Sequence, residues 1–153
     1  MSKFRLSQRS LSRMEGVHPD LVRVVKRAIE LTEIDFGITE GLRTKERQRE
    51  LVAAGASKTM NSRHLTGHAI DVAAYVGGEV RWDWPLYITI AEAFQQAARE
   101  LDVPIIWGGF WGRLDLVMDI DQSIADYTAR KRREGGRPLL DGPHYELDKQ
   151  VYA

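Results

Sequence analysis

The chain has 153 residues, with 22 lysines and arginines balanced by 22 aspartates and glutamates, and it contains no cysteine. A neutral chain lacks the basic surplus typical of nucleic-acid-binding proteins, and the missing cysteines exclude disulfides, cysteine-based zinc sites and thiol nucleophiles. Residues 1–6 lack the apolar core of a signal peptide, and no apolar run approaches the ~20 residues that span a bilayer. We therefore expect one globular domain made in the cytosol, with neither nucleic acid nor a membrane as its partner.

The first half of the chain alternates helical and extended patterns. A helix is predicted over 19–31, a strand over 36–39, a second helix over 45–54 and a polar loop over 56–67. The first helix opens at His18-Pro19-Asp20 and carries apolar residues at helical spacing. Thr44 suits the N-cap position of the second helix, which ends at Gly55.

The second half predicts most of a sheet. Strands are expected over 69–76, 79–82, 103–107 and 144–147, and helices over 86–101 and 121–133. Gly77-Gly78 is a two-residue turn between the first two of these strands, which is typical of a hairpin. Because strands and helices mix without regular βαβ alternation, we expect the α+β class, with a small antiparallel sheet flanked by helices.

The chain has four histidines, and three of them lie in glycine-bearing polar segments. His64 and His68 fall within 62–71, together with Asp71, and His144 falls within 141–146. Two imidazoles and one carboxylate would supply the three protein ligands of a catalytic zinc site and leave one position for water. Spacing alone leaves a plain alternative open, in which these are hydrogen-bonded polar residues in loops and at strand ends.

The segments 64–71 (H-x-x-G-x-A-x-D) and 141–146 (D-x-x-H-x-E) resemble the paired motifs of a zinc peptidase family. That family comprises the D-alanyl-D-alanine carboxypeptidases and the phage L-alanyl-D-glutamate endopeptidases, and its superfamily shares its fold with hedgehog signalling domains. Segments 17–21, 41–48 and 107–109 also occur in the order typical of the family, so the resemblance covers nearly the whole chain. It implies a single peptidase domain over residues 1–153, with a hedgehog-like fold and no separate wall-binding domain.

Carried over by motif position, the resemblance implies that His64, Asp71 and His144 hold one zinc ion. It also implies that Asp141 is the catalytic acid/base, placed near the last ligand by a tight turn through Gly142. A nearby carboxylate can take a proton from water and return it to the departing amine. The alternative for Asp141 is a purely structural role as a turn-forming residue before glycine.

Residues around these motifs also have expected roles. Glu146 shares a strand face with His144 and would orient its imidazole, or else replace Asp141 as the base. The resemblance places Arg43 at the family's anion-binding arginine, where its planar guanidinium would bind a substrate carboxylate, and Gln48 would help to line the cleft. Ser62 borders His64 and would touch the substrate. The alternatives are a solvated arginine at a helix start and an ordinary loop serine. The resembled motif leaves His68 outside the ligand set, and His18 is expected to cap a helix.

The expected function is a zinc-dependent endopeptidase that cuts peptidoglycan stem peptides, most simply between L-alanine and D-glutamate. As a phage-type endolysin it would act as a monomer and wait in the host cytoplasm until a membrane pore lets it reach the wall. Alternatives are a D-alanyl-D-alanine carboxypeptidase or dipeptidase, and a non-catalytic module that keeps zinc for structure. Two departures from the family are Phe110, where related sequences often carry an acid, and a long segment over 111–140, which would form a lid or a substrate wall.

Overall fold

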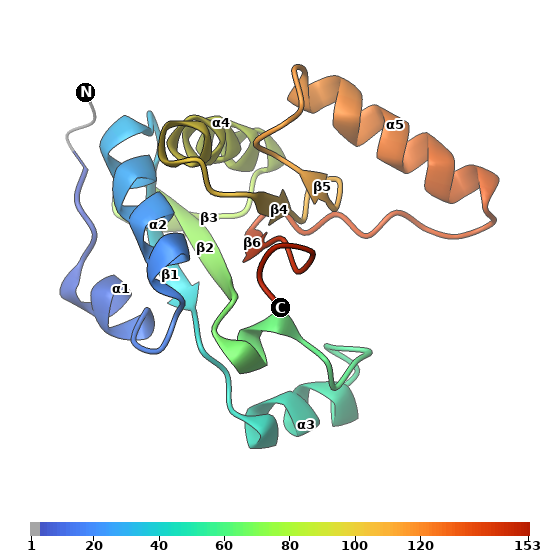
Figure 1. The fold of residues 1–153 in the computed structure, drawn as a ribbon, viewed down its shortest axis with the longest axis horizontal. Coiled ribbons are helices and arrows are strands. Elements are labelled where there is room, and N and C mark those ends of the chain that lie inside the picture. The colour runs from blue at the N-terminus through green and yellow to red at the C-terminus, as the bar shows by residue number, and fades with distance from the viewer. Residues whose placement is uncertain (1–3) are drawn as a thin grey trace.

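The computed structural model describes residues 4–153 and shows helices packed around one antiparallel sheet (Figure 1). The expected absence of a signal peptide rests on residues 1–6, of which the first three lie outside the described part. The helices are α1 (Gln8–Arg13), α2 (Pro19–Leu31), α3 (Lys45–Ala53), α4 (Trp84–Leu101) and α5 (Ile120–Arg133), with a 3₁₀ turn, η1 (Arg63–Thr66). The strands are β1 (Asp35–Glu40), β2 (Ala69–Val76), β3 (Glu79–Arg81), β4 (Ile105–Trp107), β5 (Gly112–Arg113) and β6 (His144–Leu147).

The sheet confirms the expected α+β class with an antiparallel sheet. Its strand order is β1-β2-β6-β4-β5, and the short β3 pairs with the far end of β2 through the predicted hairpin. Every pairing is antiparallel. Strand β6 is the last strand in sequence, yet it lies in the middle of the sheet between β2 and β4. The last segment of the chain therefore comes to lie beside residues from its centre.

The core lies between the sheet and the helix pair α2 and α4, which pack against each other. Leu21, Val24 and Val25 are fully buried on one stripe of α2, as their helical spacing predicts. On β2 the fully buried side chains of Ile70 and Val72 belong to the same core. Side chains alternate between the two faces of a strand, so the residues between them point away from the helices.

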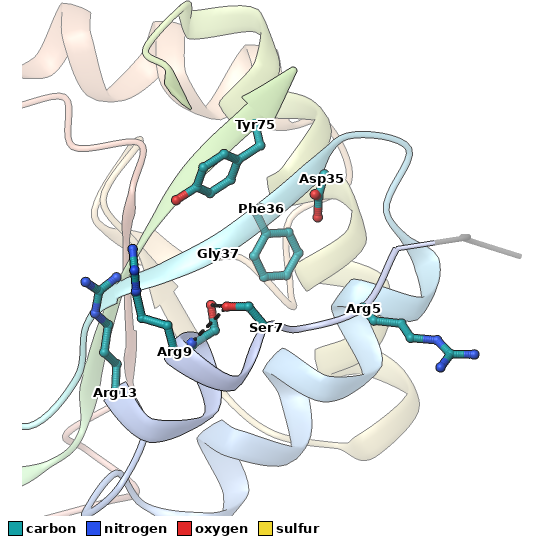
Figure 2. Close-up of a pocket in the computed structure, with 9 residues that line it drawn as sticks. Arg5, Ser7, Arg9, Arg13, Asp35, Phe36, Gly37 and Tyr75 are labelled. Carbon is teal, nitrogen blue, oxygen red and sulfur yellow. Dashed lines mark hydrogen bonds between the residues drawn. The ribbon is translucent and has the colours of Figure 1, made fainter. Parts of the chain in front are cut away.

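Helix α1 was not predicted, and its role is to cover the edge of the sheet. Ser7 caps the helix by accepting from the Ser10 backbone N–H at 3.1 Å. The Ser10 hydroxyl then accepts from the Ile38 N–H at 2.9 Å, and the Arg13 guanidinium donates to the Ile38 carbonyl at 2.9 Å. These bonds satisfy backbone groups that the edge strand β1 would otherwise leave unpaired. A pocket of about 380 Å³ remains between α1 and the first residues of β1 (Figure 2).

Most predicted elements are confirmed to within two residues, and β2 and β6 have the predicted bounds. The polar loop over 56–67 contains the short turn η1, and the two-residue β5 was also not predicted. Strand β5 forms only a two-residue pairing with the neighbouring β4, and η1 is a single turn capped by Ser62, so both are too short to show a periodic sequence pattern. Among the helices of the described residues, none combines the length and hydropathy that crossing a membrane would require.

One core residue generates a stability prediction. Tyr145 is fully buried with its ring stacked on Phe94 at 3.8 Å, and its hydroxyl has no hydrogen-bond partner among the described residues. A buried polar group without a partner costs stability, so Tyr145→Phe should raise the free energy of unfolding by about 1 kcal/mol. Urea denaturation of the two proteins measures this difference. A clear loss of stability in the variant would instead show that the hydroxyl has a partner, such as a buried water.

Candidate metal centre

Two of the predicted ligands are brought together by the pairing of β2 with β6. In the register of these strands Asp71 lies directly opposite His144. Directly opposed residues on one face of an antiparallel pair have Cβ atoms only about 4.5–5.5 Å apart. Their neighbours Ile70 and Tyr145 point into the core, so Asp71 and His144 point to the opposite face. The His144 Nδ1 lies 3.1 Å from the Asp71 Oδ1.

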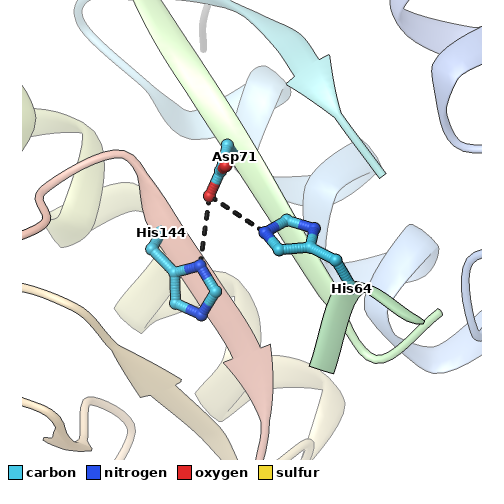
Figure 3. Close-up of side chains that lie close together, drawn as sticks. All are labelled: His64, Asp71 and His144. Carbon is cyan, nitrogen blue, oxygen red and sulfur yellow. Dashed lines mark hydrogen bonds and ion pairs between the residues drawn. The ribbon is translucent and has the colours of Figure 1, made fainter. Parts of the chain in front are cut away.

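The third residue, His64, comes from the turn η1, which precedes β2. The Ser62 side chain caps this turn by accepting from the His64 backbone N–H at 3.2 Å. The His64 Nδ1 lies 2.9 Å from the Gly41 carbonyl oxygen, so it is the protonated nitrogen that donates there. The other ring nitrogen, Nε2, is 3.4 Å from the Asp71 Oδ1. Figure 3 shows both imidazoles directed at the same carboxylate oxygen.

The geometry of these three side chains fits a metal ion. One ligand atom from each of His64, Asp71 and His144 lies within 4.8 Å of the others, and no further group of this kind occurs in residues 4–153. Bonds of about 2.0–2.1 Å in a tetrahedron would place ligand atoms about 3.3 Å apart. The observed separations of 3.4 and 3.1 Å are close to that value. The cluster could therefore hold a metal ion.

Glu146 lies on the same face of β6 as His144, as the strand period predicts. Its Oε1 is 2.8 Å from the His144 Nε2. A proton on Nε2 shared with this carboxylate leaves the Nδ1 lone pair directed at the cluster. The contact is the one expected of a residue that orients a ligand imidazole. The alternative expectation, that Glu146 replaces Asp141 as a base, has the disadvantage that this oxygen already has a partner.

Without a cation, the ionisable side chains of the cluster shift one another's pKa values. Burial would by itself raise the pKa of the Asp71 carboxyl, but hydrogen bonds with His144 and His64 outweigh it and hold that pKa well below its usual range. Burial likewise opposes a charge on His144, but its contacts with Asp71 and Glu146 raise the pKa of that imidazole to about 9. The cluster therefore favours a positive charge beside the Asp71 carboxylate.

Asp141 lies beside this cluster on the turn that leads into β6. Its backbone N–H donates to the Gly108 carbonyl at 2.9 Å, and its own carbonyl accepts from the His144 N–H at 3.1 Å. Within residues 4–153 its carboxylate has no hydrogen-bond partner. Burial raises the pKa of the Asp141 carboxyl; His144 and His64 lower it, whereas the nearby Asp71 carboxylate raises it. The result is a half-buried carboxyl group whose pKa is shifted toward neutrality.

Two glycines, Gly67 and Gly108, allow the turns around the site to pack closely on neighbouring backbone. Gly67 ends η1 with φ of 74°, and a Cβ there would stand 2.3 Å from the Gly16 carbonyl oxygen. Gly108 lies against the Asp141 turn, where a Cβ would stand 2.2 Å from the Asp141 carbonyl oxygen. Any side chain at either position would force the backbone apart. Gly67 thus lets the His64 turn pack against the segment between α1 and α2, and Gly108 lets the Asp141 turn pack against the end of β4.

The residues expected to contact substrate form hydrogen bonds and an ion pair within the protein. The Arg43 side chain is 9% exposed and forms an ion pair with Glu40. It also donates to the Gln48 Oε1 at 2.7 Å and to the Ser62 hydroxyl at 3.4 Å. Gln48 is fully buried, and its amide nitrogen donates to the Thr59 carbonyl at 2.6 Å. In this structure the group braces the turn that carries His64, and substrate contact by Arg43 and Ser62 stays a prediction.

The other two histidines lie outside the cluster. His18 caps α2, as predicted, by accepting from the Asp20 N–H at 3.0 Å. The His68 Nδ1 is 2.7 Å from the Thr66 hydroxyl oxygen, and its ring lies 5.7 Å from that of His18. The left-handed Gly67 between His64 and His68 breaks the helical geometry that would place both rings on one face.

Comparison with known proteins identifies the family of the chain. A model of the phage L-alanyl-D-glutamate peptidase family matches residues 1–148. The L-alanyl-D-glutamate peptidase of Escherichia phage T5 is 35% identical over 148 residues, which cover 94% of this chain and 98% of that protein. The crystal structure of the Serratia marcescens L-Ala D-Glu endopeptidase ChiX matches with a TM-score of 0.77 and 40% identity, covering 98% of this chain and 95% of that one. The chain therefore belongs to the phage L-alanyl-D-glutamate peptidase family.

Proposed function

We propose that this protein is a zinc-dependent endopeptidase that hydrolyses the L-alanyl-D-glutamate bond of peptidoglycan stem peptides. The observation that carries the proposal is the convergence of His64, Asp71 and His144 on one point, with the unpaired carboxyl group of Asp141 beside them. The relatives in phage T5 and Serratia marcescens carry names that specify this bond. Family membership and site geometry thus support the same chemistry.

The donor set supports zinc as the cation. Two imidazole nitrogens and one carboxylate oxygen form a set typical of catalytic zinc sites, in which a fourth position stays open. Hard cations such as magnesium and calcium prefer oxygen ligands in larger number. Three ligands from one chain would hold one zinc ion per chain. When bound there by His64, Asp71 and His144, zinc would supply a Lewis acid that activates water and polarises the scissile carbonyl.

The protein's own residues supply positioning and proton transfer. His64 and His144 are fixed by the Gly41 carbonyl and the Glu146 carboxylate, so the substrate meets a preformed site. Asp141 is half-buried, and its raised pKa makes it a stronger base than an ordinary carboxylate, which suits proton transfer. It takes a proton from the attacking water and gives it to the amine of the departing D-glutamyl residue.

The alternatives are less well supported. A D-alanyl-D-alanine carboxypeptidase would share the metal site, but the comparisons found relatives named for the L-alanyl-D-glutamate bond. A non-catalytic module that keeps zinc for structure would have no need of Asp141, whose carboxylate bonds nothing in the described part of the chain. A structural carboxylate would be expected to accept hydrogen bonds.

Mass spectrometry of peptides released from purified peptidoglycan tests the function directly. We expect fragments that begin with D-glutamate, no release after treatment with a chelator, and recovery when zinc is added back. Loss of only the terminal D-alanine would favour the carboxypeptidase. Unchanged release in the presence of chelator, with no metal in the purified protein, would contradict a metal mechanism.

Asp141→Asn should lower kcat by about 10²–10⁴-fold, because the substitution removes a general acid/base and keeps the size of the side chain. Zinc content, measured by atomic emission, should be unchanged because Asp141 is not one of the three ligands. The matched control is Asp126→Asn, an exposed position on α5. Full activity in Asp141→Asn would contradict the assigned role.

The metal-free protein should become less stable as the pH rises. The pKa of His144 is raised from 6.5 to about 9 on folding, so the folded state binds more protons in this range and loses stability between these values. The Asp71 carboxyl has the opposite pH dependence. Its pKa is lowered on folding, so it stabilises the folded protein above pH 3.8, and this stabilisation is lost as the pH falls. Urea denaturation with chelator should show the high-pH decline. Zinc should abolish the decline, because the cation replaces the proton, and so should His144→Gln.

A further inference from the structure

A second pocket lies next to the metal centre, between α5 and the segment that returns from it to β6. Its volume is about 350 Å³. We call it the α5 pocket, and its lining residues are Trp111, Tyr127, Arg130, Lys131, Arg137 and Leu139. They all come from residues 111–139, between the end of β4 and the start of β6. Figure 1 shows α5 lying to one side of the sheet, with the returning segment leading from its end back to β6.

The α5 pocket is joined to the metal centre through Trp111. The Trp111 ring lies 5.1 Å from the ring of His144. Its indole Nε1–H donates to the Leu139 carbonyl at 2.8 Å, and Leu139 precedes Asp141 by two residues. Trp111 has φ of 53°, a left-handed conformation that a bulky residue adopts only when its surroundings impose it. One wall of the pocket is therefore also a wall of the metal centre.

The far side of the pocket is held by Tyr127. Its hydroxyl accepts from the Leu139 N–H at 3.1 Å and lies 3.3 Å from the Leu139 carbonyl oxygen. These bonds tie α5 to the returning segment. The Arg130 guanidinium carbon stands 5.7 Å above the centre of the Tyr127 ring, a cation–π arrangement that holds the charge at the rim.

The charge of the pocket is positive and uncompensated. Arg130, Lys131 and Arg137 line it, and no acidic residue does. None of the three side chains forms an ion pair or a hydrogen bond with another residue in the described part of the chain. Elsewhere the arginines Arg27, Arg43 and Arg113 each pair with a carboxylate. The dipole of α5 accounts for cations in its last turn, but Arg137 lies beyond the helix and faces the same pocket.

We propose that the α5 pocket binds a free carboxylate of the stem peptide while its scissile bond lies at the metal centre. The inference rests on the proposed function and names a substrate contact beyond the reacting bond. Guanidinium and ammonium groups bind carboxylates by charge-assisted hydrogen bonds, and the Trp111 ring offers an apolar surface to the rest of the peptide. Arg43 serves this purpose less readily, because a carboxylate there must displace Glu40.

The test compares two stem peptides that differ only in whether their carboxyl groups are free or amidated. The double variant Arg130→Ala/Arg137→Ala should raise KM for the free acid by about tenfold and leave kcat nearly unchanged, because it removes charge-assisted bonds made before the reaction. For the amidated peptide the two proteins should have equal kcat/KM. Added salt should raise KM for the wild-type protein on the acid peptide more than for the variant.

Arg133→Ala is the matched control, since Arg133 is exposed on the same helix and does not line the pocket. It should behave as wild type on both peptides, and zinc content and thermal unfolding should be unchanged in every variant. An equal loss on the acid and amidated peptides, or an equal loss in Arg133→Ala, would overturn the inference. Failure of the wild-type protein to cut either peptide would instead overturn the proposed function on which it rests.

Discussion

The pairing of β2 with β6 is the constraint on which the site depends. It joins residues more than seventy positions apart and sets Asp71 opposite His144. A shift of one residue would turn the whole set of side chains on one strand to the other face. The apolar neighbours Ile70 and Tyr145 resist such a shift, because each is fully buried in the core. The same residues that stabilise the sheet therefore hold the register of the metal centre.

The two faces of these strands have different roles. One face packs on α2 and α4 and is fully buried, which makes it rigid. The other face carries Asp71, His144 and Glu146, and it receives His64 from the turn before β2. Glycines allow the turns around the site to pack closely on their neighbours, since a Cβ at Gly67 or Gly108 would collide with the carbonyl oxygen of Gly16 or Asp141. The donor atoms are thus placed by backbone packing and do not depend on flexible side chains.

Charge is distributed unevenly in a chain whose net charge is zero. Near His64, Arg43 is neutralised by Glu40 and braced by Gln48, so its cation contributes to structure. In the α5 pocket, by contrast, which Trp111 joins to His144, the cations form no ion pair with an acidic residue among residues 4–153. An acidic peptide lying across the site would meet its strongest attraction on the α5 side. The long segment between β5 and β6 thus gives this chain a surface that the metal cluster alone would lack.

The sequence by itself determined the α+β class and the bounds of β2 and β6, because alternation and helical spacing are local patterns. The likeness of segments 64–71 and 141–146 to a peptidase family also singled out the three residues that the structure brings together. Residue types and spacing alone left a metal site and ordinary polar residues as open alternatives. Only the tertiary structure decided that Gln48 is buried, that Glu146 contacts the His144 Nε2, and that α1 covers the edge of β1. These features depend on which distant segments become neighbours in space. Strand order and packing determine those neighbours, and local periodicity carries no information about them.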